Sequence, residues 1–324
     1  MKAILRCCMH ALMLSLALAA QAGMAEDYPS RPITAIWPYP PGGTGETAFR
    51  VILQECSRLL GQSIVIDNRG GAGGRVGFDA MMRGPKDGYL IGMLNSPVTI
   101  NQPLMEPSLM VTPGKNYQPI VLTHDVDFVV VVQPALPVRS MQALLDYAKA
   151  NPGKLNYGSN GQGTGGHLGM EMLKLQYGVD LTHVAYKGEA PAITGFLGAQ
   201  TDVYFASGIM KPHIDSGKAI ALATTGRGRW NLFPNLPTLK EALGSELVAT
   251  TWTGIGGPAG MPDEAVAKVN HTVNQALAAP EVRKRLDDLG MVPMGGSTEA
   301  MNELIRSDLE RWGKVIRAAN IKLN

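Results

Sequence analysis

The sequence contains almost no cysteine, few aromatic residues and nearly balanced charge. Only three cysteines occur in 324 residues, and two of them, Cys7 and Cys8, lie among the first 25. Cys56 then has no partner, so no disulfide framework is expected, and we interpret it as a small buried hydrophobic residue. Aromatic residues make up 6% of the chain but hydrophobic residues 45%. Because the apolar segments recur throughout, disorder is excluded and packed α/β structure is favoured.

The first 25 residues have the pattern of a signal peptide. Lys2 and Arg6 form a positive region, and Ala11 to Ala20 is an apolar core too short to span a bilayer. Gly23-Met24-Ala25 fits a cleavage motif, so we predict cleavage after Ala25, with Ala22 as the alternative site. No second long apolar run follows. We therefore expect export to the periplasm and a soluble protein after cleavage.

Removing the signal peptide leaves no net charge. The formal charge falls from 29 − 27 = +2 to 27 − 27 = 0, because residues 1–25 contain two basic residues and no acidic one. A neutral chain without a basic cluster is a poor candidate for nucleic-acid binding. Five histidines remain, and none forms a pair at metal-ligand spacing: His124, His167, His183, His213 and His271. We expect neither a metal nor a cofactor.

Strand-like and helix-like segments alternate after residue 26, which predicts α/β lobes with helices on both faces of largely parallel sheets. Strands are expected at 32–38, 63–67 and 88–94, and helices at 47–60 and 76–83. The pattern changes near residue 120, where two apolar strand-like runs, 120–122 and 128–132, are separated by 124–127. We interpret this as a strand crossing into a second lobe.

The second lobe repeats the alternation and the chain then returns. The expected strands are 155–159, 181–186, 202–206 and 220–224, and the expected helices are 140–150, 167–177, 190–198 and a short one from Lys211. A loop at 231–238 precedes a return strand at 249–255 and helices at 262–278, 281–289 and 298–317. The predicted organisation is residues 1–25 as signal peptide, 26–125 plus 249–324 as lobe 1, and 126–248 as lobe 2. Two crossings, near Val130 and Thr251, predict a hinge with a cleft between the lobes.

The first candidate binding loop runs from Trp37 to Glu46, between a predicted strand and a predicted helix. Its Pro40-Pro41 pair stops the strand, and Gly42-Gly43 allow the backbone to turn and to approach a ligand. The first amides of a helix have no partner within the helix and carry partial positive charge. Such a loop can hold an anion. The alternative is an ordinary strand-to-helix turn.

A second loop of the same kind covers Asn156 to His167. Gly161, Gly163 and Gly166 match the pattern G-x-G-x-x-G, and Asp180 lies about where a ribose-binding acid would follow. The dinucleotide interpretation is disfavoured because the motif lies mid-chain in an exported protein. We instead predict an anion-binding loop of backbone amides with the Ser159 and Thr164 hydroxyls.

Two further loops are candidates. Tyr186-Lys187-Gly188-Glu189-Ala190-Pro191 and Asn95-Ser96-Pro97 also follow predicted strands, although turn chemistry alone explains such residues as well. Loops at the carboxyl ends of strands in open α/β sheets are where ligands bind. We therefore expect the loops of the two lobes to face each other and to suit a ligand with a terminal carboxylate.

Short motifs along the chain together resemble one family. They are Tyr28-Pro29-Ser30-Arg31-Pro32-Ile33, Pro40-Pro41-Gly42-Gly43, Asn68-Arg69, Gly71-Ala72-Gly73-Gly74, Asp87-Gly88-Tyr89, Gly153-Lys154-Leu155-Asn156-Tyr157-Gly158-Ser159, His167-Leu168, Tyr186-Lys187-Gly188, Gly198-Ala199-Gln200-Thr201-Asp202, Pro212-His213-Ile214 and Gly217-Lys218. The ordered set spans essentially all of the chain after residue 25. It resembles the Bug-type solute receptors of tripartite tricarboxylate transporters.

The resemblance implies a non-catalytic periplasmic receptor with a two-lobed, type II-like flytrap fold. Such a receptor captures a small organic acid, a mono- or dicarboxylate with aromatic acids included, and delivers it to a large and a small membrane subunit. We expect a monomer. By the same resemblance the carboxylate is held by Gly42, Gly43 and Thr44 and by Ser159, Thr164 and Gly165, with Tyr186, Lys187 and Gly188 nearby.

Three positions depart from the family pattern and leave the ligand open. Glu46 stands where the family usually has Asp, and Ala206-Ser207 follow Phe205 where Asp is frequent. Arg75 replaces a small polar residue and either pairs with a carboxylate or is solvated. The candidate ligand-binding residues are Tyr39, Gly42, Gly43, Thr44, Glu46, Asn95, Ser96, Ser159, Asn160, Thr164, Gly165, His167, Tyr186, Lys187, Gly188, Ala206 and Ser207.

An enzyme is the alternative function. Glu46 could act as acid or base in a periplasmic hydrolase or isomerase. Gly158-Ser159-Asn160-Gly161, however, lacks the spacing of a nucleophile elbow.

Overall fold

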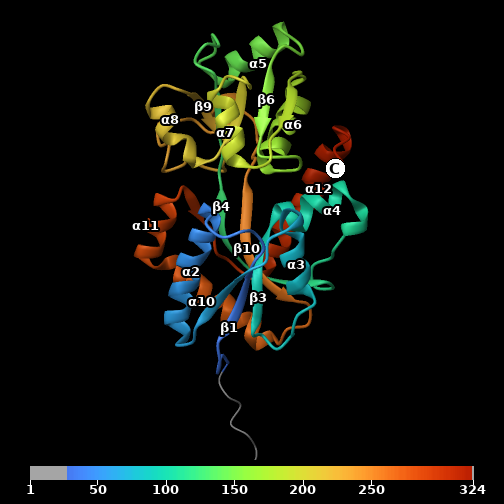
Figure 1. Cartoon of the computed structure of the whole chain (residues 1–324), viewed down its shortest axis with the longest axis vertical. Helices are drawn as coiled ribbons and strands as arrows, with labels where there is room; N and C mark the ends of the chain where they lie inside the picture. The colour runs from blue at the N-terminus through green and yellow to red at the C-terminus, as the bar shows by residue number, and fades with distance from the viewer. Residues whose placement is uncertain (1–27, 323–324) are drawn as a thin grey trace, which may run out of the picture.

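Residues 28–322 are described by a computed structural model of the chain. They form two α/β lobes joined by long strands (Figure 1). The predicted signal peptide and its cleavage site lie outside the described residues.

The larger sheet belongs to the lobe that contains the first described residues. Its order is β11-β4-β10-β3-β1-β2, with β1 (Ile33–Trp37), β2 (Ile64–Asn68), β3 (Leu90–Asn95), β4 (Tyr117–Val126), β10 (Thr251–Pro258) and β11 (Met291–Pro293). β1 pairs in parallel with β2 and β3, whereas β10 pairs antiparallel with β3 and β4, and β11 antiparallel with β4. β1 to β4 therefore run one way, and the two returning strands run the other.

The second sheet repeats this plan. Its order is β7-β6-β8-β5-β9, with β5 (Val129–Val132), β6 (Asn156–Ser159), β7 (Thr182–Ala185), β8 (Val203–Ala206) and β9 (Ile220–Thr224). β6 is parallel to β7 and β8, and only the crossing strand β5 runs antiparallel to its neighbours. The main direction in each lobe is thus parallel, as predicted, and the exceptions are the strands that cross between the lobes or follow the return.

Helices cover both faces of each sheet. In the first lobe they are α2 (Thr44–Leu60), α3 (Arg75–Met82), α4 (Gln102–Met105), α10 (Asp263–Ala278), α11 (Pro280–Asp288) and α12 (Thr298–Ala318). In the second they are α5 (Met141–Ala150), α6 (Gly165–Tyr177), α7 (Glu189–Leu197), α8 (Lys211–Asp215) and α9 (Leu239–Leu243). Short helical turns at Ala72–Gly74, Pro97–Asn101, Pro107–Leu109 and Gly208–Met210 complete the set.

The alternation of β1 shows how the sequence builds the first lobe. Ile33, Ala35 and Trp37 pack with α2, α10 and α11 on one face, whereas Ile36 packs with α3 and α12 on the other. Successive side chains of a strand point to opposite faces, so a strand buried on both sides reads as a continuous apolar run.

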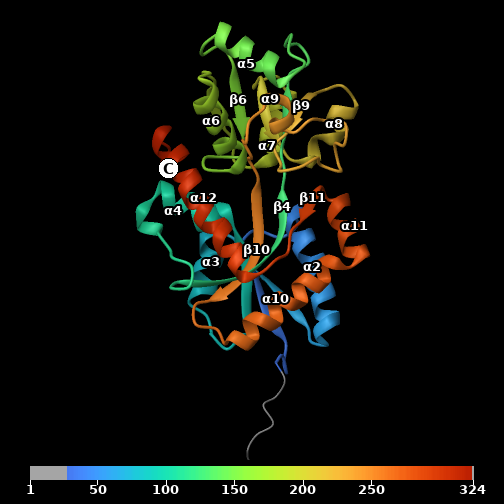
Figure 2. The same cartoon turned by 180° about the vertical axis from the view of Figure 1, so that it is seen from behind.

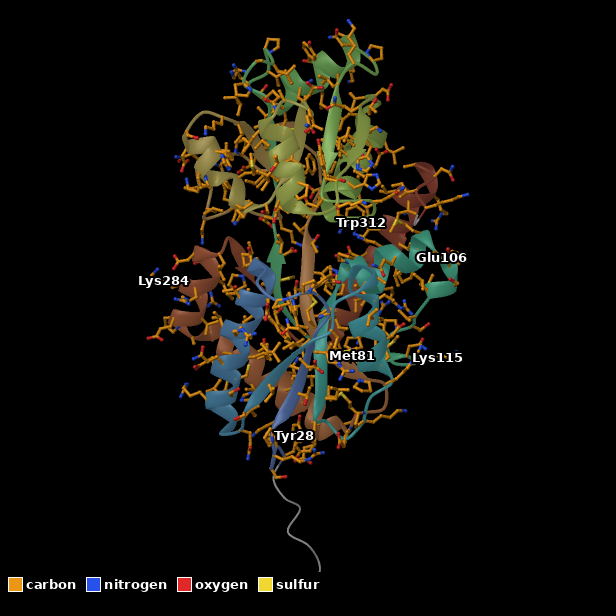
Figure 3. The ribbon with its side chains drawn as sticks, viewed as in Figure 1. Tyr28, Met81, Glu106, Lys115, Lys284 and Trp312 are labelled. Atoms are coloured by element: carbon orange, nitrogen blue, oxygen red, sulfur yellow. The ribbon has the colours of Figure 1, made fainter. Side chains whose placement is uncertain are left out.

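β4 and β10 extend side by side from the first sheet toward the second lobe (Figure 2). β4 ends at Val126 and β5 begins at Val129, while the return strand begins at Thr251. One hydrophobic cluster continues through this junction, from Phe128 of the second lobe to Trp252 of β10 and Trp312 of α12. Trp312 lies between the lobes in Figure 3.

Most predicted strands and helices are present, with shifted ends. The predicted break at 124–127 is wrong in part, because β4 continues to Val126 and pairs there with both β10 and β11. The helical segment Pro97–Met105, α9 and β11 were missed. Asn95-Ser96-Pro97 was predicted as a loop, but Pro97 begins a helical turn, and proline is tolerated at a helix start. No helix among residues 28–322 is both long and apolar enough to cross a membrane.

Candidate functional site

A cavity of about 470 Å³ lies between the two lobes. It is lined by the beginnings of α2, α6 and α7, by the end of β8, by the two crossings, and by the end of α11 with the start of β11. A larger groove of about 940 Å³ lies between α2 and α11, and its lining includes Glu55, Arg58, Lys284 and Arg285. That groove contains none of the predicted site residues.

The N-terminus of α2 contributes Thr44 and Gly45 to the cavity. Gly43 is the N-cap residue in an extended conformation, and no side chain caps the helix. Thr47 N–H is the first to bond back, to Gly43 O at 3.1 Å. The amides before it are not used within the helix and carry its partial positive charge. The first predicted anion loop therefore does open onto the cavity.

Glu46 points away from this opening. It is buried, and its Oε2 accepts a hydrogen bond from Gly42 N–H at 2.6 Å while Arg50 Nη2 donates to its Oε1 at 2.5 Å. The Gly42 amide and the Arg50 guanidinium hold the pKa of Glu46 below its usual value, against the opposing effect of burial. The carboxylate thus fixes Gly42 in its turn, at φ 97°, instead of lining the cavity.

The N-terminus of α6 at the cavity has neither a side-chain cap nor an acidic residue in its first turn. Thr164, Gly165 and Gly166 line the cavity. Thr164 Oγ1 donates to Gly161 O at 2.7 Å, so the hydroxyl holds the loop. Gly165 and Gly166 place no side chain of their own over the first amides of the helix, which suits an anion.

α7 and the end of β8 complete this side. Gly188 is the uncapped N-cap residue of α7, and Glu189 lines the cavity. Ser207 also lines it, and its Oγ accepts from Ile209 N–H at 3.3 Å. Asn160 lines it too, with its Oδ1 accepting from Tyr204 OH at 2.5 Å. That bond engages the acceptor half of the Asn160 amide and leaves the NH₂ group as the half able to donate to a carboxylate.

A stacked histidine pair, buried His167 and half-buried His183, supports the second loop. Ser159 is fully buried, and its Oγ lies 2.7 Å from His183 Nε2. The His183 ring stacks on His167 at 3.9 Å between centroids, and His167 Nδ1 accepts from Gly163 N–H at 3.0 Å. Burial lowers the pKa of His183 to about 4 and that of His167 to about 3, so both rings are neutral at pH 7. Ser159 and His167 therefore shape the loop without lining the cavity.

The other predicted residues lie outside the lining. Tyr39 OH accepts from Asn95 Nδ2 at 2.7 Å, and Asn95 Oδ1 accepts from Val98 N–H at 3.1 Å. This chain of bonds positions the turn that begins at Pro97, which does line the cavity. The predicted residues that are not in the lining are Tyr39, Gly42, Gly43, Glu46, Asn95, Ser96, Ser159, His167, Tyr186, Lys187, Gly188 and Ala206.

Arg75 is engaged elsewhere. Its Nε donates to Asp79 Oδ1 at 2.6 Å and its Nη1 to Leu109 O at 2.8 Å. The guanidinium ties α3 to the segment after α4, which is a structural use of the position. No Arg, Lys or His is among the residues that line the cavity.

Sequence reasoning missed the apolar wall of the cavity. Phe128 and Thr251 come from the crossings, Leu232 from the predicted loop, and residues 288–291 from the end of α11. These residues carry no local motif. They can be identified as cavity residues only from the folded structure, in which these segments lie close together.

The lobes also touch on either side of the cavity. Asn101 Nδ2 donates to Gly163 O at 2.9 Å, which joins the turn after β3 to the second loop. On the other side, a Cβ atom placed on Gly290 would lie 3.1 Å from Leu232 and 3.2 Å from Trp230. The conformation described is therefore one in which the lobes are in contact.

Buried carboxyl groups lie at the first crossing. Burial, followed by the neighbouring Asp125, raises the pKa of Asp127 to about 7, while Arg227 opposes the shift. Burial likewise raises the pKa of Asp125. Among residues 28–322, no group of three or more His, Cys, Asp or Glu residues is placed to hold a metal ion.

Comparison with known proteins identifies the family. The family model described as "Tripartite tricarboxylate transporter family receptor" matches residues 48–321. The chain belongs to this receptor family. The match begins within α2, after the first loop, and covers the rest of the first lobe and all of the second, so the family assignment applies to the two-lobed unit.

Relatives and a solved structure support the same assignment. The chain is 34% identical to a Pseudomonas sp. (strain P51) protein, "UPF0065 protein in tcbD-tcbE intergenic region", over 94% of this chain and 91% of that protein. It is 32% identical to "Protein BugT" of Bordetella pertussis, over 92% of each chain. The structure of R. palustris Rpa4515 with adipate is similar at a TM-score of 0.79 and 31% identity, covering 91% of this chain and 99% of that one. The predicted receptor family and the predicted two-lobed binding-protein fold are thus both confirmed.

Proposed function

We propose that this receptor captures a small organic acid in the cavity between its lobes and delivers it to the large and small membrane subunits of a tripartite tricarboxylate transporter. It would act as a monomer in the periplasm, after removal of residues 1–25. The lobes of this proposal are residues 26–125 with 249–324, and residues 126–248.

One observation carries the proposal. Uncapped N-termini of α2 from one lobe and of α6 from the other open onto the same cavity. Backbone amides at helix starts favour anions, and here the cavity supplies no basic side chain that could replace them. An acid bound by both helix starts would hold the two lobes together, as a flytrap mechanism requires.

We infer a non-catalytic role. Ser159 and His183 have the distance of a nucleophile and its base, but Ser159 is fully buried and outside the cavity lining. Glu46, the candidate acid or base, uses both oxygens within its own loop. Incubation of candidate acids with the protein should therefore give no turnover, and catalytic conversion of any of them would favour the enzyme alternative.

The direct test is a thermal-shift screen over mono-, di- and tricarboxylates, aromatic acids included. A ligand at about one hundred times its Kd should stabilise the protein by roughly 2.7 kcal/mol. The best acid is then followed by small-angle scattering, in which binding should reduce the radius of gyration or narrow its distribution. Uncharged amides of the same acids are the control and should give no shift. If no carboxylate stabilises the protein, the proposal is wrong.

A further inference from the structure

The cavity is chemically uneven from one side to the other. Its charged lining residues are Glu189 and Asp288, and both are acidic. Glu189 lies in the first turn of α7 and so offsets the positive end of that helix. α6 has no acidic residue in its first turn, and the acidic residue of α2, Glu46, is paired with Arg50 outside the cavity. The most favourable position for a carboxylate is therefore at the start of α6, and the start of α2 lies across the cavity from it.

The side of the cavity away from the α6 start is apolar, and the electrostatic potential at its far end is negative. Leu232, Leu289 and Met291 form this wall, and Ile209 stands at its edge. α11 ends here at Asp288, so its partially negative C-terminus faces the same region. Lys284 pairs with Asp288 at 2.8 Å, but it lies outside the lining, and Figure 3 shows it at the outer edge of the lobe.

We propose that the receptor selects monocarboxylates with an apolar body and disfavours acids with a second carboxylate at the far end. The inference rests on the proposed function of the same cavity. A carboxylate only accepts hydrogen bonds, and burying one without a donor or cation is costly. One such group uses the amides of the α6 and α2 starts together with the Asn160 NH₂, whereas a second would meet the Leu289–Met291 wall and the Asp288 end. The cavity is near the lower end of the usual range for ligand sites, so the body must be small.

The proposal sets this chain apart from a similar protein. The R. palustris structure holds adipate, an acid with a carboxylate at each end. The cavity of this chain has no basic side chain to bind a second carboxylate, so we expect it to prefer the acid that lacks the second charge.

Matched acids with the same carbon skeleton test the inference: hexanoate against adipate, and 4-methylbenzoate against terephthalate. Calorimetry on the full mature protein should give at least tenfold tighter binding of the monocarboxylate in the better-bound pair, equivalent to about 1.4 kcal/mol. Equal or tighter binding of the dicarboxylate would overturn the inference while leaving the proposed function intact. If none of the four acids binds and the wider carboxylate screen is also negative, the proposed function itself fails.

A variant designed to bind dicarboxylates more tightly provides a second, independent test of the inference. Ile209 is 54% exposed at the cavity edge, so Ile209→Arg should fold normally while placing a cation where the second carboxylate would lie. We expect the dicarboxylate of each pair to bind at least tenfold tighter to this variant than to the parent protein. Ile209→Gln, which adds length and polarity without charge, is the matched control and should leave the preference unchanged. Failure of Ile209→Arg to improve dicarboxylate binding would also count against the inference.

Discussion

Replacing Gly165 with alanine probes the contact between the α6 start and the hinge. Gly165 begins the helix, and its φ lies outside the left-handed region, so alanine fits the backbone. In the helix alone the change would stabilise by up to about 1 kcal/mol. A Cβ atom here would, however, press on Thr251 Oγ1 and lie 2.9 Å from Phe128 ring carbons, closer than real side chains approach. Both neighbours belong to the crossings.

The added methyl group therefore disfavours the lobe arrangement described here more than it disfavours folding. Overpacking of this kind costs about 1–3 kcal/mol. A small rotation of the second lobe about the crossings relieves the shorter contact, with Thr251 of the return strand, so this larger part of the cost falls on the ligand-bound arrangement. Phe128 moves with Gly165, and its ring must turn in either arrangement. We expect affinity for the best acid of the screen to fall by about 5- to 150-fold. The melting temperature of the free protein should change little.

Calorimetry and thermal unfolding on the same preparations distinguish the outcomes. Gly43→Ala is the matched control, because a Cβ atom there meets nothing within 4 Å and the backbone is extended. That variant should bind as the parent does, since only backbone amides of the first loop are proposed to face the ligand. The reasoning is refuted if Gly165→Ala binds within twofold of the parent protein, or if it loses stability as well as affinity.

Three further variants test electrostatic claims. Glu46→Gln should lower the melting temperature, because it weakens the bonds to the Gly42 amide and to Arg50, and should leave the ranking of acids unchanged; a shifted ranking would return Glu46 to the ligand site. The parent protein should lose stability as pH rises from about 4, the pKa of Asp127 in the unfolded chain, to about 7, its pKa in the folded protein. The slope is up to about 1.4 kcal/mol per pH unit, and Asp127→Asn should remove this loss. Urea unfolding at pH 5 and 8 measures it, and equal gains at both would contradict the assignment. Asp308→Ala should cost about 3–5 kcal/mol in urea unfolding, since buried Asp308 accepts from Trp252 Nε1 at 2.9 Å and pairs with an arginine on α12; a loss below 1 kcal/mol would show that the pair is dispensable.

The sign of the Asp127 effect follows from its raised pKa. Below about pH 4 the carboxyl is protonated in both states and does not affect stability. Between 4 and 7 the unfolded chain releases the proton while the folded protein retains it, so unfolding becomes easier as pH rises. Neutral His167 and His183 act in the opposite direction below about pH 6.5, because the unfolded chain binds protons that the folded rings do not. The difference between Asp127→Asn and the parent isolates the carboxyl from these histidines.

The sequence by itself determined the plan of this protein. The alternation of apolar strands and amphipathic helices predicted two α/β lobes, and the glycine-rich loops predicted helices that begin directly after them, at Thr47 and His167. The helices begin three and two residues earlier, at Thr44 and Gly165. These features are local, since strand and helix periodicity and turn chemistry act within about ten residues. Even the change of pattern near residue 120 located the first crossing, although β4 extends through the charged stretch because β10 and β11 pair with it there.

Tertiary structure decided which residues face the ligand cavity. Glu46 does not line the cavity because its two carboxylate oxygens accept hydrogen bonds from the Gly42 amide and from Arg50. Ser159 is buried because β7 places His183 beside it. The apolar wall combines Leu232 with residues from the end of α11, which are about 55 positions apart in the chain and meet only because the chain returns to the first lobe. Contacts of this range depend on the packing of whole elements, and no local sequence pattern encodes them.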